Sequence, residues 1–487
     1  MERAEGDQPV SDRRGGVRLF QSRDAETAMT EFSVRGSNVV VVGAARSGVA
    51  AARLLADRGA RVTLTEMRSN VGAEVERLSE LGVDLELGGH RPETFERADL
   101  VVLSPGVPPS LAALEPARRA RVPIISEIEL ASRWLRGRVV AVTGTKGKST
   151  TVVLLGRMLE AGGCLVLVGG NVGTALSTQV EQSTADVIHV VEVSSFQLEL
   201  TTRFRPWIAV FLNLYADHLD RHADIEAYAA AKARVFANQQ SSDTLVVNAD
   251  DPEVLRLARD SAARRVSFAL SEPLTEGVVV AGDTIVRRSP AGDEPLVPLS
   301  AVHLLGRHLL GDVLAASAVA NLVGVSAGDM TRAVDRFTGL EHALQRVGEV
   351  GGVRFVNDSK ATNVEAARHA VESCGDHVVV IMGGRFKGGS LETLAPLFAS
   401  RADAVVVIGE ACGRIRDALG AVVRVVETGS LADAVRVAYG LASPGGTVLL
   451  APACASLDMF RDYAERGRVF TQAVAHLEEE VGETREQ

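Results

Sequence analysis

The sequence predicts an α/β protein of three domains. Short Val- and Ile-rich runs alternate with longer amphipathic stretches rich in Ala, Leu and Arg, which is the pattern of parallel sheets covered by helices. This alternation restarts twice, and 487 residues are more than one compact core normally holds. We therefore expect a flexible extension at 1–34 and domains at 35–126, 127–339 and 340–487.

The predicted strands are short apolar runs bounded by polar or glycine-containing segments. They lie at 38–42, 61–65, 100–103, 139–143, 187–193, 208–212, 244–247, 353–356, 377–382, 404–408 and 447–450. Between 271 and 299 the sequence is richer in Gly, Pro and β-branched residues, which predicts a small antiparallel excursion within the second domain.

Composition excludes several classes of partner. The formal net charge of −10 provides no overall positive field for nucleic acid or an anionic membrane surface. The four cysteines form no CxxC pair, which argues against a disulfide framework or zinc cluster and favours the cytoplasm. No apolar run approaches the ~18 residues of a membrane span, and 1–31 lacks the apolar stretch of a signal peptide. Small-molecule ligands are the expected partners.

The strongest motif is a glycine-rich turn between the predicted strand at 139–143 and a predicted helix at 152–160. Its residues are Gly144, Thr145, Lys146, Gly147, Lys148, Ser149 and Thr150. Backbone N–H groups in such a turn can surround phosphate oxygens, and the helix N-terminus adds partial positive charge. Lys148 would reach the outer phosphates, and the hydroxyl of Ser149 or Thr150 would face Mg²⁺. We expect an ATP-binding loop; a structural glycine turn is the alternative.

Candidate metal ligands follow the next two strands. Glu192 ends one strand, and Asp217 and His218 follow the other, so they should meet near the phosphate loop. Carboxylate oxygen suits Mg²⁺, and imidazole can complete a second metal position. His222 has zinc-pair spacing with His218, but no third ligand follows, and we interpret it as a solvated residue. Lys232, taken by itself, is a surface lysine on an alanine-rich helix.

The first domain opens with a nucleotide-type turn. Gly43 and Gly48 follow the strand at 38–42, with Ala45 where a dinucleotide fingerprint has its middle glycine. Glu66 ends the next strand, where an NAD enzyme places an acidic residue on the ribose. An NAD-dependent oxidoreductase therefore remains an alternative for this domain.

Three loops of the third domain combine small residues with hydroxyls or a cation. They span 357–363, 383–389 and 452–458, each after an apolar strand. Such loops suit a small dicarboxylate ligand. Cys454, in the last of them, has no His nearby in the sequence, so we interpret it as a packing residue.

At these motifs the chain resembles the Mur ligases, from about residue 37 to its end. GTKGKST, EVSSFQLE and NLYADHLDRH resemble the ATP and metal motifs that the family shares with folylpolyglutamate synthases. NDSKATN and PACASLD resemble the branch that adds D-glutamate. The resemblance implies an ATP-dependent ligase of peptidoglycan precursor synthesis, which activates UDP-N-acetylmuramoyl-L-alanine as an acyl phosphate and joins it to D-glutamate. A cytoplasmic monomer is expected.

The resemblance also implies the fold and the site residues. We expect a Rossmann-like N-terminal domain that binds UDP, a central P-loop-type ATPase domain, and a Rossmann-like C-terminal domain that binds D-glutamate. The UDP-substrate residues are Arg46, Ser47, Glu66, Arg68, Gly106 and Asn171. ATP is bound by the loop 144–150 with Asp312 and Asp358, and two Mg²⁺ ions by Ser149, Glu192, His218 and Lys232. In the family this lysine is carbamylated by CO₂. The catalytic residues are Lys148, His218 and Lys232, and the D-glutamate residues are Thr362, Lys387, Ser456 and Tyr463.

The chain departs from the family at a few positions. Asp312 stands where an HNxxN segment ends in Asn, and Lys146 where many relatives have Asn. Ala343 replaces an expected Arg, with Arg346 three positions later. A folylpolyglutamate-type ligase and a catalytically weak nucleotide-binding scaffold are the remaining alternatives.

Overall fold

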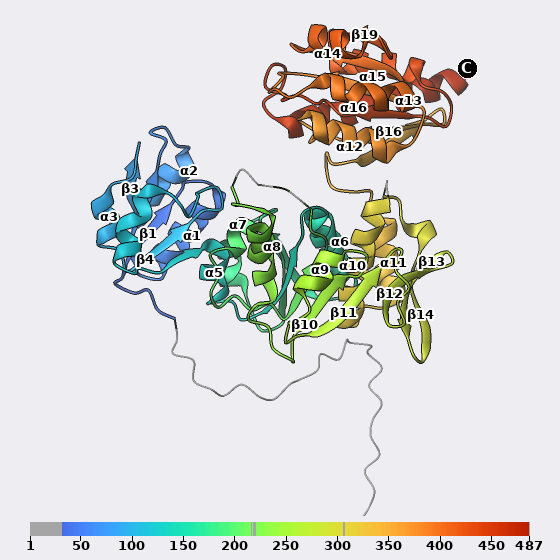
Figure 1. The fold of residues 1–487 in the computed structure, drawn as a ribbon. Helices are drawn as coiled ribbons and strands as arrows, with labels where there is room; N and C mark the ends of the chain where they lie inside the picture. Colours follow the sequence, from blue (N-terminus) through green and yellow to red (C-terminus); the bar gives the residue numbers. More distant parts are fainter. Residues whose placement is uncertain (1–31, 216, 218–220, 305–306, 487) are drawn as a thin grey trace, which may run out of the picture.

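Three α/β sheets follow one another along the chain (Figure 1). The structure is a computed structural model, and it describes residues 32–215, 217, 221–304 and 307–486. Each sheet has a hydrophobic core on both faces, and neighbouring residues of one strand belong to opposite cores. Val140 and Val142 of the second sheet pack on one face, and Val139 and Ala141 pack on the other. Burial on both faces explains the continuous apolar runs and confirms the α/β fold class.

The first sheet has the order β3-β2-β1-β4-β5, and all of its strands are parallel. Its strands are β1 (Asn38–Val42), β2 (Arg61–Glu66), β3 (Asp84–Leu87), β4 (Leu100–Leu103) and β5 (Ile124–Ser126). The helices are α1 (Arg46–Asp57), α2 (Ala73–Glu76), α3 (Pro92–Glu96), α4 (Glu115–Arg119) and α5 (Glu127–Ser132). The chain reverses direction across the sheet between β1 and β4, which is where ligands bind in open α/β sheets.

The second sheet has the order β14-β13-β12-β11-β10-β9-β6-β8-β7. Its strands are β6 (Arg138–Thr143), β7 (Leu165–Gly170), β8 (Val187–Glu192), β9 (Ile208–Phe211), β10 (Thr244–Asn248), β11 (Arg264–Ala269), β12 (Gly277–Ala281), β13 (Thr284–Ser289) and β14 (Gly292–Pro298). The helices are α6 (Lys148–Ala161), α7 (Ser195–Leu198), α8 (Ile225–Ala233), α9 (Pro252–Leu257), α10 (Arg307–Val323) and α11 (Ala327–Asp335). Pairing is antiparallel from β12 to β14, which confirms the predicted excursion.

The third sheet has the order β15-β16-β20-β17-β18-β19. Its strands are β15 (Gln345–Val350), β16 (Val353–Asn357), β17 (Val378–Gly383), β18 (Ala402–Ile408), β19 (Arg424–Glu427) and β20 (Thr447–Leu450). The helices are α12 (Val364–Cys374), α13 (Ala395–Arg401), α14 (Cys412–Leu419), α15 (Leu431–Leu441) and α16 (Tyr463–Glu486). Only β15 runs antiparallel to its neighbour in this sheet.

The first two sheets are connected through α5. The carboxylate of Glu129 on this helix is fully buried, and it accepts hydrogen bonds from the backbone N–H groups of Thr202, Arg203 and Phe204. Burial is the largest single influence on the pKa of Glu129, and it raises that pKa. The hydrogen bonds to the carboxylate act in the opposite direction, and the pKa is below its ordinary value. The chain then enters the third sheet through one segment, 336–344, in which Gly339 has a φ of +109°.

Among the described residues, no helix combines the length and apolar character needed to cross a membrane. The predicted extension at 1–34 lies, up to residue 31, outside the described part of the chain.

Candidate active site

The phosphate-type loop connects β6 to α6 at the carboxyl end of a central strand. Gly144 and Gly147 have φ values of +155° and +85°, a region that side chains rarely allow. The first hydrogen bond of the helix runs from Thr151 N–H to the Gly147 carbonyl. The N–H groups between these residues therefore precede the helical ladder, as an anion site at a helix N-terminus requires.

Asn213 holds this loop from the next strand. Its Oδ1 accepts hydrogen bonds from the backbone N–H groups of Thr145 at 3.0 Å and Lys146 at 2.9 Å. Its Nδ2 donates to the carbonyl of Lys146 at 3.1 Å. We did not predict this role, although Asn213 opens a motif at a strand end, and a side-chain amide in that position can bond one loop through both of its ends.

Lys148 folds back over the loop. Its Nζ donates to the carbonyl oxygens of Gly144 at 2.9 Å and Thr145 at 2.8 Å. Burial lowers the pKa of Lys148, and the nearby carboxylates of Glu192, Asp217 and Asp312 oppose this shift. This placement puts a cation beside the loop where the sequence predicts phosphate.

Glu192 and Ser149 meet at the end of β8. The Ser149 hydroxyl donates to Glu192 Oε2 at 2.6 Å, and Asn171 Nδ2 donates to Glu192 Oε1 at 2.7 Å. Arg46 donates to the carbonyl of Asn171 at 3.2 Å, so Asn171 connects the first sheet to this group. A buried carboxylate paired with a hydroxyl has the oxygen donors that Mg²⁺ prefers.

No cluster of three or more His, Cys, Asp or Glu side chains among the described residues could hold a metal ion. Since Mg²⁺ commonly takes one or two protein ligands and completes its shell with phosphate oxygens and water, the Ser149 and Glu192 pair fits one such ion. The predicted ligand His218 lies outside the described residues.

Lys232 is not the surface lysine that its helix suggests. Its side chain is 2% exposed, and its Nζ donates to the Gly144 carbonyl at 2.8 Å. The same Nζ lies 4.5 Å from the centre of the Tyr228 ring. Burial lowers the pKa of Lys232 to about 7, and the positive charge of Lys148 contributes in the same direction. A substantial fraction of the amine is therefore uncharged at neutral pH.

The interpretation of His222 as a solvated residue is wrong. The side chain is 6% exposed, and its ring stacks on Phe196 with centroids 5.4 Å apart and an interplanar angle of 19°. Tyr228 is a second ring neighbour among the described residues, at 5.3 Å, and His222 Nε2 is hydrogen-bonded to Ser195 Oγ at 3.0 Å. His222 is buried because it packs against the rings of Phe196 and Tyr228. The spacing of residues in the sequence does not reveal this packing.

Two carboxyl groups predicted to bind ATP are buried. Asp312 is 3% exposed and lies against Gly147, where an added Cβ would come within 2.1 Å of its Oδ1. Burial raises its pKa well above the ordinary value. Asp358 accepts a hydrogen bond from Leu344 N–H at 3.2 Å, and burial raises its pKa to about 7. Their roles toward ATP remain predictions.

The predicted UDP-substrate residues of the first sheet lie along its carboxyl edge. Arg46 and Ser47 begin α1, Glu66 ends β2, Arg68 follows it, and Gly106 lies in the loop after β4. The Glu66 carboxylate accepts from the N–H of Ala44 at 2.8 Å and from the Arg68 side chain at 3.1 Å. The bond with Arg68 is the main reason that the pKa of Glu66 falls to about 2. Glu66 thus fixes the turn that a ligand would contact.

The predicted D-glutamate residues lie on loops at the carboxyl edge of the third sheet and at the start of α16. Thr362 follows β16, Lys387 follows β17, Ser456 follows β20 and Tyr463 begins α16. Two of these loops pair through backbone hydrogen bonds of 2.8 and 2.9 Å between Arg385 and Ala455. Ser456 is buried, whereas Lys387 is exposed. The three loops therefore meet at one edge of the sheet, and their role toward D-glutamate remains a prediction.

Arg466 joins these loops, and sequence reasoning missed it. The guanidinium is 1% exposed and donates to the carbonyls of Ser359, Gly383 and Cys454 and to the Ser359 hydroxyl. Burial lowers its pKa to about 10. A buried arginine on a helix with a polar sequence is visible only once the packing of that helix is known.

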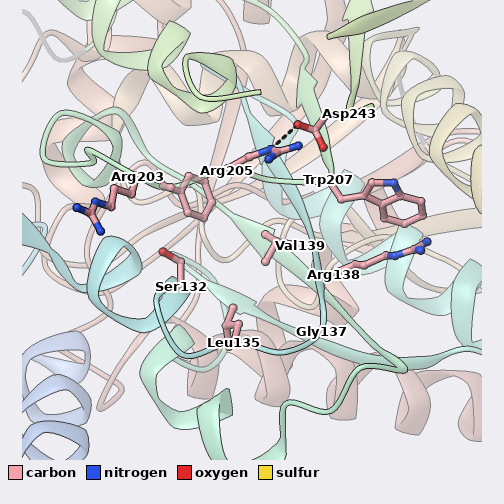
Figure 2. Close-up of a pocket in the computed structure, with 10 residues that line it drawn as sticks. Ser132, Leu135, Gly137, Arg138, Val139, Arg203, Arg205, Trp207 and Asp243 are labelled. Carbon is pink, nitrogen blue, oxygen red and sulfur yellow. Dashed lines mark hydrogen bonds and ion pairs between the residues drawn. The ribbon is translucent and has the colours of Figure 1, made fainter. Parts of the chain in front are cut away.

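A pocket of about 330 Å³ lies at the amino ends of β6, β9 and β10 (Figure 2), whereas the phosphate-type loop lies at the carboxyl end of β6. Arg205 is paired with Asp243 at 2.7 Å, and Arg138 lies over the Trp207 ring at 4.5 Å. Figure 2 shows the Arg138 and Arg203 side chains pointing away from each other. The pocket is therefore separate from the loop site and lacks a converging set of charges.

Comparisons with known proteins agree with this geometry. Three family models match in order: "Mur ligase MurD-like, N-terminal domain" at 37–126, "Mur ligase middle domain" at 142–320, and "Mur ligase, glutamate ligase domain" at 344–454. The UDP-N-acetylmuramoylalanine–D-glutamate ligase of Acidobacterium capsulatum is 46% identical over 91% of this chain and 97% of its own. The chain belongs to the Mur ligase family. The ligase of the same name from Geotalea uraniireducens is 44% identical to this Mur ligase, over 91% of this chain and 98% of its own.

Solved structures share the Mur ligase fold. A pseudomurein peptide ligase type C from Methanothermus fervidus covers 91% of this chain and 100% of its own, with a TM-score of 0.53 at 17% identity. A UDP-N-acetylmuramoyl-L-alanyl-D-glutamate–2,6-diaminopimelate ligase covers 91% and 93%, with a TM-score of 0.55 at 18% identity. Because the chain belongs to this ligase family, we reject the alternative of an NAD-dependent oxidoreductase.

Proposed function

We propose that this Mur ligase joins D-glutamate to UDP-N-acetylmuramoyl-L-alanine with ATP, in peptidoglycan precursor synthesis. The relatives that cover nearly the whole chain at 46% and 44% identity carry the name of that reaction. The structural observation that carries the proposal is the meeting of the loop, the Ser149 and Glu192 pair and Lys232 at one edge of the second sheet. These groups provide what carboxylate activation by ATP requires.

The first chemical step is phosphoryl transfer. An oxygen of the L-alanyl carboxylate attacks the γ-phosphorus of ATP, the bond to the β-phosphate oxygen breaks, and ADP leaves. Because anions approach each other, catalysis depends on positioning and charge neutralisation. Lys148 and the N–H groups at the start of α6 provide these effects at the γ-phosphate. Ser149 and Glu192 would hold Mg²⁺, which when bound neutralises phosphate charge.

The second step forms the amide. The free amine of D-glutamate attacks the carbonyl carbon of the acyl phosphate, loses a proton, and inorganic phosphate leaves. We assign D-glutamate binding to Thr362, Lys387, Ser456 and Tyr463, because their loops are held together at one sheet edge. A lysine and hydroxyl groups can neutralise and bond the two carboxylates. Closure of the third domain over the loop would exclude water from the acyl phosphate.

Lys232 is proposed to carry a carbamate. Its pKa near 7 leaves an uncharged amine that can attack CO₂, forming an N–C bond and releasing one proton. The product is an anion in place of a cation beside Lys148 and the Gly144 carbonyl. Together with His218, this carbamate would be the protein ligand set of a second Mg²⁺. We also propose a cytoplasmic monomer; its four cysteines are free, as suits a reducing compartment.

An amine panel tests the proposal. Purified protein is supplied with UDP-N-acetylmuramoyl-L-alanine, ATP, Mg²⁺ and bicarbonate, and then with D-glutamate, L-glutamate, L-lysine or diaminopimelate. We expect one ADP and one phosphate for each peptide bond, with D-glutamate as the accepted amine. Folate with L-glutamate should give no ADP. This result would distinguish the proposed D-glutamate ligase from a folylpolyglutamate-type ligase, which would release ADP with these substrates. Absence of any D-glutamate product would exclude both the proposed reaction and its site.

A further inference from the structure

Five side chains stack in a continuous row beside the phosphate loop, and we call them the aromatic column. In order they are Arg221, Phe196, His222, Tyr228 and Lys232. The Arg221 guanidinium lies 4.6 Å from the Phe196 ring centre, and Phe196 stacks on His222 at 5.4 Å. His222 contacts Tyr228 at 5.3 Å, and Tyr228 faces the Lys232 ammonium at 4.5 Å. The column therefore has a basic side chain at each end and three rings between them.

The two ends of the column contact different parts of the site. Arg221 donates to the carbonyl of Val107 at 2.9 Å, in the loop of the first sheet that follows β4. At the other end the Tyr228 hydroxyl donates to Thr145 Oγ1 at 3.2 Å, and Lys232 donates to the Gly144 carbonyl at 2.8 Å. One packed row thus connects the predicted UDP-substrate loop to the phosphate loop.

His222 is the central ring of this row. It is 6% exposed, and Tyr228 is 1% exposed, so the rings pack against each other without solvent between them. Tyr228 and Lys232 are one helical turn apart on α8, which places the ring and the ammonium on the same face. The position of the Tyr228 ring limits the positions that the lysine side chain can take. His222 contacts the same ring, with centroids 5.3 Å apart, and limits the positions that it can take.

We propose that His222 is a positioning residue, whose ring holds Tyr228 against Lys232 and the phosphate loop. This inference rests on the proposed function for the role of Lys232 as a carbamate. We assign the effect to the ring of His222, since it contacts the rings of both Phe196 and Tyr228. The hydrogen bond between its Nε2 and Ser195 Oγ helps to orient this ring. Aromatic pairs of this kind contribute about 0.5–1.5 kcal/mol beyond their buried area.

Two substitutions separate the ring from the hydrogen bond. His222→Phe keeps an aromatic ring and removes the bond to Ser195, whereas His222→Gln keeps a polar group and removes the ring. Full-length proteins are incubated with ¹³C-bicarbonate and Mg²⁺, and the ¹³C carbamate signal of Lys232 is measured by NMR against bicarbonate concentration. For His222→Gln we expect half-saturation at roughly three- to tenfold higher bicarbonate, the factor that the loss of one aromatic pair predicts. His222→Phe should stay within about twofold of the wild type by the same reasoning.

His189→Gln is the matched control. His189 is also fully buried in the second sheet, but its partners are Ser183 and Gln179, away from the loop. This variant should lower the melting temperature while leaving the carbamate titration unchanged. ADP affinity, measured by calorimetry, provides a second readout because Tyr228 bonds Thr145. It should weaken in His222→Gln and not in His222→Phe.

The outcomes distinguish this inference from the proposed function. If His222→Gln matches the wild type in both titrations, or if His222→Phe is the impaired variant, the ring has no positioning role. If the wild type shows no carbamate signal but joins D-glutamate, the carbamate and this inference both fail while the reaction stands. If it forms neither carbamate nor peptide bond, the proposed function fails.

Discussion

Lys148 and Lys232 donate to the same backbone carbonyl oxygen, that of Gly144, at 2.9 and 2.8 Å. Two ammonium groups on one acceptor repel each other, and this repulsion adds to burial in lowering the pKa of Lys232. The arrangement favours the loss of one positive charge. Conversion of Lys232 to an anion would turn this repulsion into attraction and leave Lys148 as the cation for the phosphates.

Replacement of Lys148 tests the phosphate loop. Lys148→Ala should lower kcat by roughly 10²- to 10³-fold, the factor typical for removal of a charge-stabilising donor. The melting temperature should change little, because the variant also removes a buried cation. ADP and phosphate release, followed together with peptide-bond formation, measure the effect. Retention of most of the turnover would contradict the loop assignment.

The contact between Gly147 and Asp312 predicts that Gly147→Ala weakens ATP binding in a way that depends on the Asp312 side chain. In Gly147→Ala the new Cβ would lie 2.1 Å from Asp312 Oδ1, on a backbone with a φ of +85°. We expect ATP to bind at least about tenfold more weakly, since a clash and a left-handed residue together cost more than ~1.4 kcal/mol. Calorimetric titration with a non-hydrolysable ATP analogue measures the change.

Asp312→Ala provides the matched background. Because Asp312 is itself predicted to bind ATP, the double variant is compared with Asp312→Ala alone. Gly147→Ala should weaken binding less in that background than in the wild type, since the carboxyl that meets the new Cβ is gone. The loss that remains reflects backbone strain, on the order of 1–2 kcal/mol. If Gly147→Ala weakens binding equally in both backgrounds, the contact with Asp312 is not the cause of the defect.

Asp358 predicts a pH dependence of stability. Its pKa is about 7 in the folded protein and about 3.8 when unfolded, so the folded state holds a proton that the unfolded chain has lost between these values. Its favourable contribution is complete below the lower pKa and disappears as the pH rises to about 7. Asp358→Asn lacks this dependence and should gain stability relative to the wild type over that window, by on the order of 2–4 kcal/mol.

Urea midpoints of both proteins, measured from about pH 4 to about pH 8, test this sign. The difference should rise with pH and become constant above the folded pKa. Asp186→Asn is the control, because it makes the same substitution at an exposed position directly before β8. A difference for Asp358→Asn that falls with pH would reverse the assignment.

Arg466 predicts a selective loss of D-glutamate binding. Arg466→Lys keeps the charge, but an ammonium cannot bridge the carbonyls of Ser359, Gly383 and Cys454 with the geometry of a guanidinium. Unfolding should become easier by about 2 kcal/mol or more, because buried carbonyls lose their partner. KM for D-glutamate should rise while KM for ATP stays near the wild-type value. Arg468→Lys, an exposed position on the same helix, is the control.

Sequence patterns predicted the interior of each sheet better than its edges. Strands β3, β5, β7, β15 and β19 are absent from the predicted runs, and each lies at the edge of its sheet. Edge strands are partly exposed, and β19, for example, has exposed residues at both ends. Their sequences therefore lack the continuous apolar run that predicts a strand buried on both faces. The inner strand β11 was also absent from the predicted runs, and it begins with two exposed arginines.

The loop site could be predicted because its signal is local. A strand, a glycine turn and a helix follow one another in the sequence, and the chemistry depends on backbone within that span. Lys232 and His222 could not be placed in the same way. Whether either is buried depends on Gly144, Ser195 and Phe196, which come from other elements. The alanine-rich sequence of α8 has no distinct polar face, so it does not indicate whether Lys232 is buried or exposed.

The single passage of the chain into the third sheet has a kinetic consequence. Gly339, His342 and Leu344 all have positive φ in this segment, which gives the tether a defined path. The Lys146 ammonium is already 3.1 Å from His369 on the far side. A short tether of this kind keeps the loops proposed to bind D-glutamate at high effective concentration around the loop proposed to bind ATP. Amide formation can therefore follow activation by an intramolecular movement, before the acyl phosphate has time to diffuse away.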